Sequence, residues 1–399
     1  MSVIPKIRFK GFTDAWEQRK LGDVFKEYSE KNHTELPPLT IIQGGGTVKR
    51  ENSDRNLMYD ESNLSNYKMV RKNDFIVHLR SFERGREKTS IDSIISPAYH
   101  TFHSDAADSR FYYPYFRSHE FIKHKLVPHV YGIRDGRSID IAGMKTIEIP
   151  YTSMEEQRKI GDYLESLDHL ITLHQRKCDE TKELKKYMLQ KMFPKKGEKV
   201  PEIRFEGFTA DWEQRKLGEV FEQTAHFVNP NEEEIELWSL TVEGGLTSKT
   251  ERYNREFLVK KDNNFKEVRP GEIVYNPMNM TLGAVGYNGM TKSVAVSGYY
   301  TTMIAKNGHD SYYVNTWLKS PQAISLYKTF ATGSLIEKQR VQYSTLSVIP
   351  AAFPKHEEQV KIGKLFSSLD NLITLHQRKC DSLKELKKFM LQNMFPKEK

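Results

Sequence analysis

Side chains that can hydrogen-bond to the edges of DNA bases gather in short segments of this chain. Arginine and lysine can pair with guanine O6 and N7, and asparagine or glutamine with adenine N6 and N7. The segments RSFERGREK (residues 80–88) and GIRDGRS (132–138) lie in the first half, and NPMNMT (276–281) and GSLIEKQR (333–340) lie at matching places in the second half. A solvated loop is the alternative for any one residue, but the matching placement favours a shared function. The candidate DNA-contacting residues in these segments are Arg80, Arg84, Arg86, Lys88, Arg134, Arg137, Asn276, Asn279, Lys338, Gln339 and Arg340.

Two glycine-containing segments add one lysine to each half. QGGGTVKRE (residues 43–51) aligns with EGGLTSKTE (243–251), which places Lys49 and Lys249 at equivalent positions, and both join the DNA-contact candidates. The glycines could form a phosphate-binding loop. However, neither G-x-x-x-x-G-K-[ST] after a strand nor G-x-G-x-x-G occurs in the chain, so a tight turn is the favoured interpretation.

Two other motifs were weighed as catalytic or metal-binding sites. Asn276-Pro277-Met278-Asn279 is similar to the Asn-Pro-Pro-aromatic tetrapeptide of DNA amino-methyltransferases, but it lacks the second proline, the aromatic residue and a preceding glycine-rich cofactor motif. His174 with Cys178, and His376 with Cys380, form i, i+4 pairs that suit tetrahedral zinc. The favoured alternative is that these groups fix the register of a helix seam. We therefore predict no catalytic, cofactor-binding or metal-ligating residue and no enzymatic activity of the chain itself.

The elements that position the candidate segments belong to an internal duplication. IRFKGFTDAWEQRKLGDVF (residues 7–25) returns as IRFEGFTADWEQRKLGEVF (203–221), shifted by 196 positions. EEQRKIGDYLESLDHLITLHQRKCD (155–179) returns as EEQVKIGKLFSSLDNLITLHQRKCD (357–381), shifted by 202 positions. The stretches between these blocks have mostly diverged. The period is too long for a solenoid, so the chain holds two versions of one module in a common frame.

The second repeated block predicts two long helices. Apolar residues recur at steps of three and four, which is typical of a coiled coil. Ser153 and Glu156 resemble a capping box at the first helix start, Pro354 suits the start of the second, and both helices should end at Met-Phe-Pro steps after about 40 residues. The predicted seam residues are Ile160, Leu164, Leu167, Ile171, Ile362, Phe366, Leu369 and Ile373.

Symmetry predicts how the copies are arranged. Two copies of one unit in a closed arrangement are usually related by a two-fold axis, which sets the helices antiparallel with the inserts at opposite ends. The linker PKKGEKVPEIRF (residues 194–205) resembles the two chain termini, VIPKIRF and FPKEK, joined together. The architecture should therefore be pseudo-two-fold and nearly circular.

The inserts predict mixed α/β domains of one fold. Expected strands are residues 75–79, 93–102 and 146–149 in the first, and 272–275, 293–304 and 346–349 in the second. Expected helices are residues 112–125 and 312–329. The fold class is thus α+β, with two α/β domains separated by a long antiparallel two-helix coiled coil.

The composition sets limits on partners and compartment. A net charge of +8 and a pI near 9.0 permit a nucleic-acid partner, although binding by phosphate neutralisation alone should show denser basic runs. No apolar run approaches the ~18–20 residues of a membrane span, and the first residues lack the apolar region of a secretion signal. The two cysteines are copies of each other and form no disulfide framework, so we expect a cytoplasmic protein without membrane contact.

The chain resembles the specificity subunits of Type I restriction-modification systems over essentially its full length. The residues that carry the resemblance are the paired W-E-Q-R-K-L-G-x-V-F segments (16–25 and 212–221), the paired E-E-Q-x-K-I-G helices, and the segments 145–150 and 344–350 that lead into them. The two copies differ where the helix begins: Pro354 precedes the second helix, whereas Met154 or its neighbours stand at that place before the first helix.

The resemblance implies a non-catalytic subunit that reads an asymmetric, split sequence in double-stranded DNA through two target-recognition domains. Its helices would space these domains and dock two methyltransferase subunits, and two endonuclease subunits would complete the complex. S-adenosylmethionine, ATP and Mg²⁺ would belong to those partners, with no cofactor in this chain. A coiled-coil adaptor without a DNA role is the alternative. The predicted boundaries are 1–150 (first recognition domain), 151–195 (first helix), 196–350 (linker and second recognition domain) and 351–399 (second helix).

Overall fold

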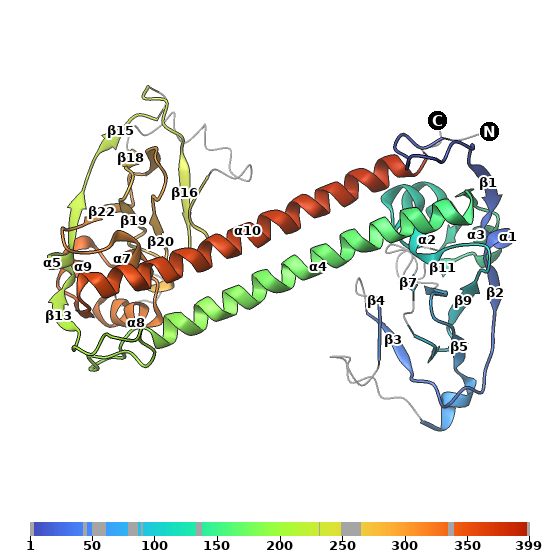
Figure 1. Ribbon diagram of the computed structural model, residues 1–399, viewed down its shortest axis with the longest axis horizontal. Coiled ribbons are helices and arrows are strands. Elements are labelled where there is room, and N and C mark those ends of the chain that lie inside the picture. Colours follow the sequence, from blue (N-terminus) through green and yellow to red (C-terminus); the bar gives the residue numbers. More distant parts are fainter. Residues whose placement is uncertain are drawn as a thin grey trace. The chain divides into compact units, whose positions relative to one another are not determined.

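The computed structural model describes residues 4–42, 46–49, 61–78, 87–88, 91–132, 138–230, 232–248, 265–333 and 339–396. The chain divides into two compact units: unit 1 contains Met1–Gln175 and Arg378–Lys399, and unit 2 contains Arg176–Gln377. The boundaries fall inside two long helices, α4 (Met154–Lys191) and α10 (His356–Met394), which Figure 1 labels. Each unit therefore holds one insert domain and a part of both helices.

Unit 1 is built on an antiparallel sheet with the strand order β2-β9-β6-β7 among its described residues. Phe75 of β6 lies opposite Phe102 of β9, and both rings are buried. Strand β1 pairs with β12, which places the first repeated segment beside the strand that leads into α4. The elements before α4 are β1 (Glu17–Lys20), α1 (Leu21–Val24), β2 (Lys26–Tyr28), β3 (Leu39–Ile42), β4 (Gly46–Lys49), η2 (Glu61–Asn66), β5 (Lys68–Val70), β6 (Phe75–His78), β7 (Glu87–Lys88), β8 (Ser93–Ile95), β9 (Tyr99–His103), α2 (Ser109–Phe116), η4 (Phe121–Leu126), η5 (Val127–His129), β10 (Val130–Tyr131), β11 (Ser138–Ile139), α3 (Ile141–Lys145) and β12 (Glu148–Tyr151).

Unit 2 repeats this topology. Its central sheet has the order β14-β22-β19-β20, with Ile273 of β19 opposite Met303 of β22. Strand β13 pairs with β23 as β1 pairs with β12. The prediction that both inserts share one fold is therefore confirmed. The elements between α4 and α10 are β13 (Glu213–Lys216), α5 (Leu217–Val220), β14 (Phe221–Thr224), β15 (Phe227–Val228), β16 (Trp238–Thr241), β17 (Gly245–Ser248), β18 (Phe265–Val268), β19 (Ile273–Tyr275), η7 (Met280–Leu282), β20 (Val285–Tyr287), β21 (Val294–Ser297), β22 (Thr301–Ala305), α7 (Ser311–Leu318), α8 (Pro321–Phe330), α9 (Tyr343–Ser347) and β23 (Pro350–Phe353).

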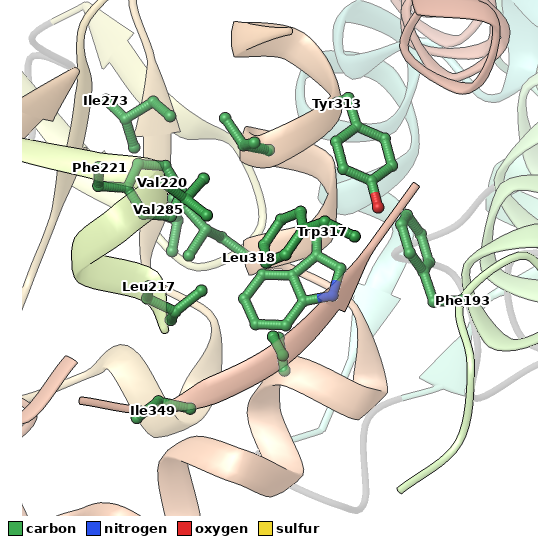
Figure 2. Close-up of a cluster of buried hydrophobic side chains, with 14 of the residues drawn as sticks. Phe193, Leu217, Val220, Phe221, Ile273, Val285, Tyr313, Trp317, Leu318 and Ile349 are labelled. Atoms are coloured by element: carbon green, nitrogen blue, oxygen red, sulfur yellow. The ribbon is translucent and has the colours of Figure 1, made fainter. Parts of the chain in front are cut away.

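The core of each unit joins the insert domain to the long helices. In unit 2 the indole of Trp317 on α7 lies among apolar side chains from the sheet and from Leu217 and Ile349, with Phe193 beside Tyr313 (Figure 2). Ile362 and Phe366 of α10 belong to the same core. The first half of the helix stripe is thus covered by the domain that the helix carries.

The helices begin and end close to the predicted positions. The backbone N–H of Glu156 donates to Ser153 Oγ at 3.3 Å, which confirms the serine half of the predicted capping box. The carboxylate of Glu156 accepts from Arg8, Trp16 and Thr152 instead. Helix α4 has 38 residues and α10 has 39, near the expected length. Helix α4 ends at Lys191, immediately before the Met-Phe-Pro step.

The two repeated blocks are joined by a buried ion pair in each unit. Arg8 donates two hydrogen bonds to the carboxylate of Glu156, from Nε to Oε1 at 2.6 Å and from NH2 to Oε2 at 2.8 Å. In unit 2, Arg204 binds Glu358 in the same bidentate way at 2.7 and 2.8 Å. Because both glutamates are buried, each pair ties the I-R-F segment firmly to the first turn of a long helix.

The glutamine that follows each of these glutamates positions the insert domain. Gln157 Oε1 accepts from the backbone N–H of Asp108 at 3.0 Å, and its Nε2 donates to the carbonyl oxygen of Thr152 at 2.8 Å. Gln359 makes the equivalent bonds to Asp310 and Pro354 at 3.1 and 2.9 Å. Asp108 and Asp310 are the N-caps of α2 and α7, so the E-E-Q motif orients these helices.

The N-terminal segment takes in unit 1 the place that the linker takes in unit 2. The backbone N–H of Ile7 donates to Asn393 O near the end of α10 at 3.0 Å, and that of Ile203 donates to Lys191 O at the end of α4 at 2.9 Å. This supports the view that the two termini correspond to a linker that has been cut.

Some strand predictions were wrong in detail. The strands expected over 93–102 and 293–304 are each two strands, β8–β9 and β21–β22. Turns separate them, closed by hydrogen bonds from Tyr99 N to Ser96 O and from Tyr300 N to Ser297 O. The segment 346–349 is not a strand: Leu346 belongs to α9 and the strand begins at Pro350. Likewise β12 begins at Glu148 rather than Thr146. The two long runs are divided at the turn residues Ser96-Pro97 and Ser297-Gly298. The short run 346–349 could not by itself be distinguished from a short buried helix.

The two insert helices are interrupted rather than continuous. Over 112–125, α2 ends at Phe116 and η4 begins at Phe121. Over 312–329, α7 ends at Leu318 and α8 begins at Pro321. Ser320 Oγ accepts from Ala323 N at 3.1 Å and caps the new helix. A serine followed by proline starts a helix readily, and it ends the preceding one.

Candidate nucleic-acid interface

Strands β19 and β20 of unit 2 are joined by a turn that holds two candidate residues, Asn276 and Asn279. Asn276 Oδ1 accepts from the backbone N–H of Met278 at 3.0 Å, and the backbone N–H of Asn276 donates to Ala284 O at 3.1 Å. Asn276 is half-buried and shapes the turn, whereas Asn279 is exposed at its outer side. Of the two, Asn279 has the side chain placed to contact a ligand.

A second candidate loop lies against this turn. Thr332 and Arg340 exchange two backbone hydrogen bonds of 3.0 and 2.9 Å, which close the base of the loop. The backbone N–H of Val341 donates to Pro277 O at 3.0 Å and links the two loops. The structure therefore brings Asn276 and Asn279 near half-buried Gln339 and exposed Arg340. Lys338 lies outside the described residues.

The candidates of unit 1 fall mostly outside the part of the chain that the structure describes. Lys88 is in β7, whose backbone pairs with β6, and Lys49 ends β4 with an exposed side chain. Strands β10 and β11 pair through Tyr131 and Ser138 and flank the segment that contains two candidate arginines. The candidates outside the described residues are Arg80, Arg84, Arg86, Arg134 and Arg137, together with Lys249 of unit 2.

Two lysines beside the sheets have a structural role instead. Lys68 Nζ donates to Tyr99 O and Lys266 Nζ donates to Tyr300 O, both at 2.7 Å. Partial burial lowers the pKa of both ammonium groups. These equivalent lysines support the turns before β9 and β22, so they are poor candidates for DNA contact.

Sequence analysis missed two exposed apolar side chains in the β19–β20 turn. Leu282 is 60% exposed and Met278 is also exposed, although Met280 between them is fully buried. The sequence signal for an exposed apolar contact was that Met278 and Leu282 stand among polar residues in this segment. Their exposure became visible only with the fold.

Within each unit, parts of α4 and α10 run antiparallel. In unit 1, Lys387 Nζ donates to Asp168 Oδ1 at 2.5 Å, and Cys380 Sγ lies 3.5 Å from Gln175 Oε1. In unit 2 the equivalent contacts join Lys185 with Asp370 and Cys178 with Gln377. As the residue number increases along α4, the residue number of the contacting partner on α10 decreases, so the two helices are antiparallel. The register interpretation of the cysteines agrees with these contacts.

The predicted seam residues divide into two groups. Six are buried in the cores that join helix and insert domain, and Ile171 and Ile373 are half-buried on the helix pair. The six buried seam residues are Ile160, Leu164, Leu167, Ile362, Phe366 and Leu369.

Among the described residues, no three His, Cys, Asp or Glu side chains are grouped to hold a metal ion.

Each unit exposes four large apolar residues on its helix segments. They correspond one to one across the duplication and are 36–52% exposed. The duplication has therefore kept the same apolar positions exposed in both units. No helix in the described part of the chain is long and apolar enough to cross a bilayer. The outer apolar residues are Leu170, Leu173, Leu386 and Phe389 in unit 1, and Leu372, Leu375, Leu184 and Tyr187 in unit 2.

The family comparison decides what these paired features belong to. The profile of the Type I restriction modification DNA specificity domain matches residues 13–183 and 209–385, one match for each module. The chain belongs to this family. The resemblance seen in the W-E-Q-R-K-L-G and E-E-Q-x-K-I-G segments is thereby confirmed.

One solved structure of a specificity subunit has the same fold as this chain. The S subunit of a Type I restriction-modification system from M. genitalium matches with a TM-score of 0.66 at 15% identity, covering 99% of this chain and 100% of that chain. The HsdS subunit from Thermoanaerobacter tengcongensis matches with a TM-score of 0.42 at 16% identity, over 95% and 96% of the two chains. At such low identity the first match shows the shared fold, and the α+β class is confirmed.

Proposed function

We propose that this member of the specificity family is a non-catalytic subunit that reads an asymmetric, bipartite sequence in double-stranded DNA. The observation that carries the proposal is that two domains of one topology have different residues between equivalent pairs of strands, β6–β7 and β19–β20. The β19–β20 turn offers asparagine, methionine and leucine, whereas the sequence between β6 and β7 offers arginine and glutamate. Domains with different contact residues select different half-sites.

The outer apolar residues of the helices support the docking of two methyltransferase subunits. Each unit carries one set of four, so a partner that recognises one set has a second, equivalent place to bind. Two endonuclease subunits complete the proposed complex. S-adenosylmethionine, ATP and Mg²⁺ belong to those partner subunits, and the complex acts in the cytoplasm.

The helices are proposed to set the number of unspecified base pairs between the half-sites. Deleting one heptad from both α4 and α10 would shorten each helix by about 10 Å, or roughly three base pairs. The expected outcome is a shorter spacer with unchanged half-sites. Altered half-sites after this deletion would contradict the ruler role.

A genome-wide map of methylated adenines tests the proposal. Cells that express this chain with its methyltransferase subunit are compared with cells that lack the chain. The expected result is a new motif of two defined parts around a fixed gap. Absence of new methylation, with the partner shown to be bound, would reject the proposal and leave the adaptor role, which a gel shift of the assembled complex would examine directly.

A further inference from the structure

The turn between β19 and β20 exposes an amide side chain, Asn279, and an apolar side chain, Leu282. The backbone N–H of Leu282 donates to Asn279 O at 3.0 Å, which closes one 3-10 turn over η7. Asn279 is the N-cap residue of this turn and Leu282 is its last residue, three positions further on. Both are exposed, while Met280 is buried in the core.

Backbone contacts hold this turn in one conformation. The backbone N–H of Ala284 donates to Asn279 O at 3.1 Å, and Asn276 fixes the first part of the turn through Met278. Gly283 has φ of 87°, a left-handed conformation that favours glycine and reverses the chain into β20. The exposure of Leu282 is therefore imposed by the fold, because the turn itself is packed through Met280.

The pair of side chains matches the major-groove edge of an A·T base pair. Adenine offers the N7 acceptor and the N6 donor, which the amide of asparagine can bind together, and thymine offers its C5-methyl group to an apolar side chain. A G·C pair has no such methyl. Leucine has no donor or acceptor, so it adds discrimination only where a methyl group is present.

We propose that Asn279 and Leu282 together read one A·T pair in the half-site bound by unit 2, with Asn279 on adenine and Leu282 on the thymine methyl group. This inference rests on the proposed function, since it assigns chemistry to one of the two recognition domains. Arg340 is exposed on the segment that is joined to this turn by the hydrogen bond from Val341 N to Pro277 O.

The test uses the assembled complex of the full chain with its methyltransferase subunit. Once the methylation map gives the target, duplexes are made in which deoxyuridine replaces each thymine in turn, which removes only the methyl group. Binding is measured at one fixed salt concentration. At one thymine of the half-site bound by unit 2, the wild-type complex should bind about fourfold more weakly, the value of one buried methyl group.

Two variants connect this thymine to the turn. Leu282→Ala should bind the thymine duplex about fourfold more weakly and should be indifferent to uracil at that position. Asn279→Ala should lose at least about fivefold and relax the preference for adenine in the same pair. Val348→Ala, at another exposed apolar residue of unit 2, is the matched control and should leave both half-sites unchanged.

The outcomes separate this inference from the function on which it rests. Specific binding by a complex in which Leu282→Ala keeps the full wild-type sensitivity to uracil overturns the assignment, as does a half-site that contains no A·T pair. A wild-type complex that binds no sequence specifically overturns the proposed function as well. The uracil series on wild-type protein needs no variant, and thermal unfolding checks that Leu282→Ala is folded.

Discussion

The two units surround the same buried carboxylate with different numbers of donors. In unit 1, Glu156 accepts from Arg8, from Trp16 Nε1 at 3.0 Å and from the hydroxyl of Thr152. In unit 2, the hydrogen bonds to Glu358 found in the described residues come from Arg204. Pro354 stands where unit 1 has Thr152, and it has no hydroxyl to donate.

The tryptophans show the same difference. Trp212 is buried like Trp16, but its Nε1 has no hydrogen-bond partner among the described residues. The hydroxyl of Tyr313 is also buried and unpaired there, at the position where unit 1 has Phe111. The bidentate arginine–glutamate pair is the interaction with this carboxylate that both units share. The surrounding donors can be lost without loss of the fold.

The largest expected effect concerns the outer apolar residues of the helices. Leu372→Glu with Leu375→Glu in unit 2 should remove one of the two methyltransferase subunits proposed to bind, because charge would replace the proposed apolar contact. Leu170→Glu with Leu173→Glu should do the same in unit 1. The mass of the complex in solution measures this, with Ser368→Glu as the control at an exposed polar position. Two partner copies bound to both variants would refute the docking assignment.

Replacing the arginine of the buried arginine–glutamate pair should destabilise the two units by different amounts. Arg204→Leu leaves the buried carboxylate of Glu358 without its donor and should destabilise unit 2 by about 3–5 kcal/mol. Arg8→Leu should destabilise unit 1 by less, because Trp16 and Thr152 still donate to Glu156. Native-state hydrogen exchange measures each unit separately. Equal losses would show that those two donors do not compensate, and Arg204→Leu with Glu358→Leu should recover stability.

Replacing the helical glycine Gly363 by alanine should destabilise the protein, although alanine has the higher helix propensity. A Cβ on Gly363 would lie 2.5 Å from Asp310 Oδ1, the N-cap group of α7, whereas one on Gly161 would lie 3.0 Å from Arg110 Cβ. Gly363→Ala should therefore destabilise unit 2 by about 1–3 kcal/mol, although alanine normally favours a helix. Gly161→Ala should have the smaller effect. Thermal unfolding measures both, and a stabilised Gly363→Ala would contradict the close approach.

Tyr313→Phe gives unit 2 the residue type that unit 1 has at Phe111, and it should slightly increase the stability of unit 2. It removes a buried hydroxyl that has no partner in the described residues, so unit 2 should be unchanged or more stable by up to about 1 kcal/mol. Tyr112→Phe is the control, because the Tyr112 hydroxyl donates to Pro150 O at 2.9 Å and its loss should destabilise unit 1. A destabilised Tyr313→Phe would indicate that the hydroxyl has a partner.

The smallest effect is a change in the pH dependence of unit 1 that comes from His103. Partial burial lowers the pKa of His103, but the hydrogen bond and charge of Asp74 outweigh it, so the pKa is raised above its ordinary value of 6.5. This contribution to stability is complete below pH 6.5 and is lost as the pH rises through the folded-state pKa. His103→Gln should therefore lower the stability of unit 1 at acidic pH and approach wild type at alkaline pH. Unit 2, with Ile304 at this place, provides the internal comparison.

The repeats made much of the frame predictable. The capping serine at residue 153, the helix lengths and the matching topology of both inserts followed from local sequence and duplication, and the structure confirms them. The continuous strands over 93–102 and 293–304 were wrong because turns at Ser96 and Ser297 interrupt apolar runs. Asn276 and Asn279 looked alike as candidates, yet only the fold showed that the first shapes the turn and the second faces outward.

The amino-acid sequence alone determined the two-module organisation, the long helices and the family, because these depend on periodicity and repeated motifs. Tertiary structure decided which side chains are buried and which remain exposed. Ile160 and Ile171 follow the same helical rhythm, but the insert domain buries the first, whereas the second lies on the helix pair and is half-buried. The physical reason is that burial depends on what packs against a residue from distant parts of the chain, and periodicity reports only the face on which that residue lies.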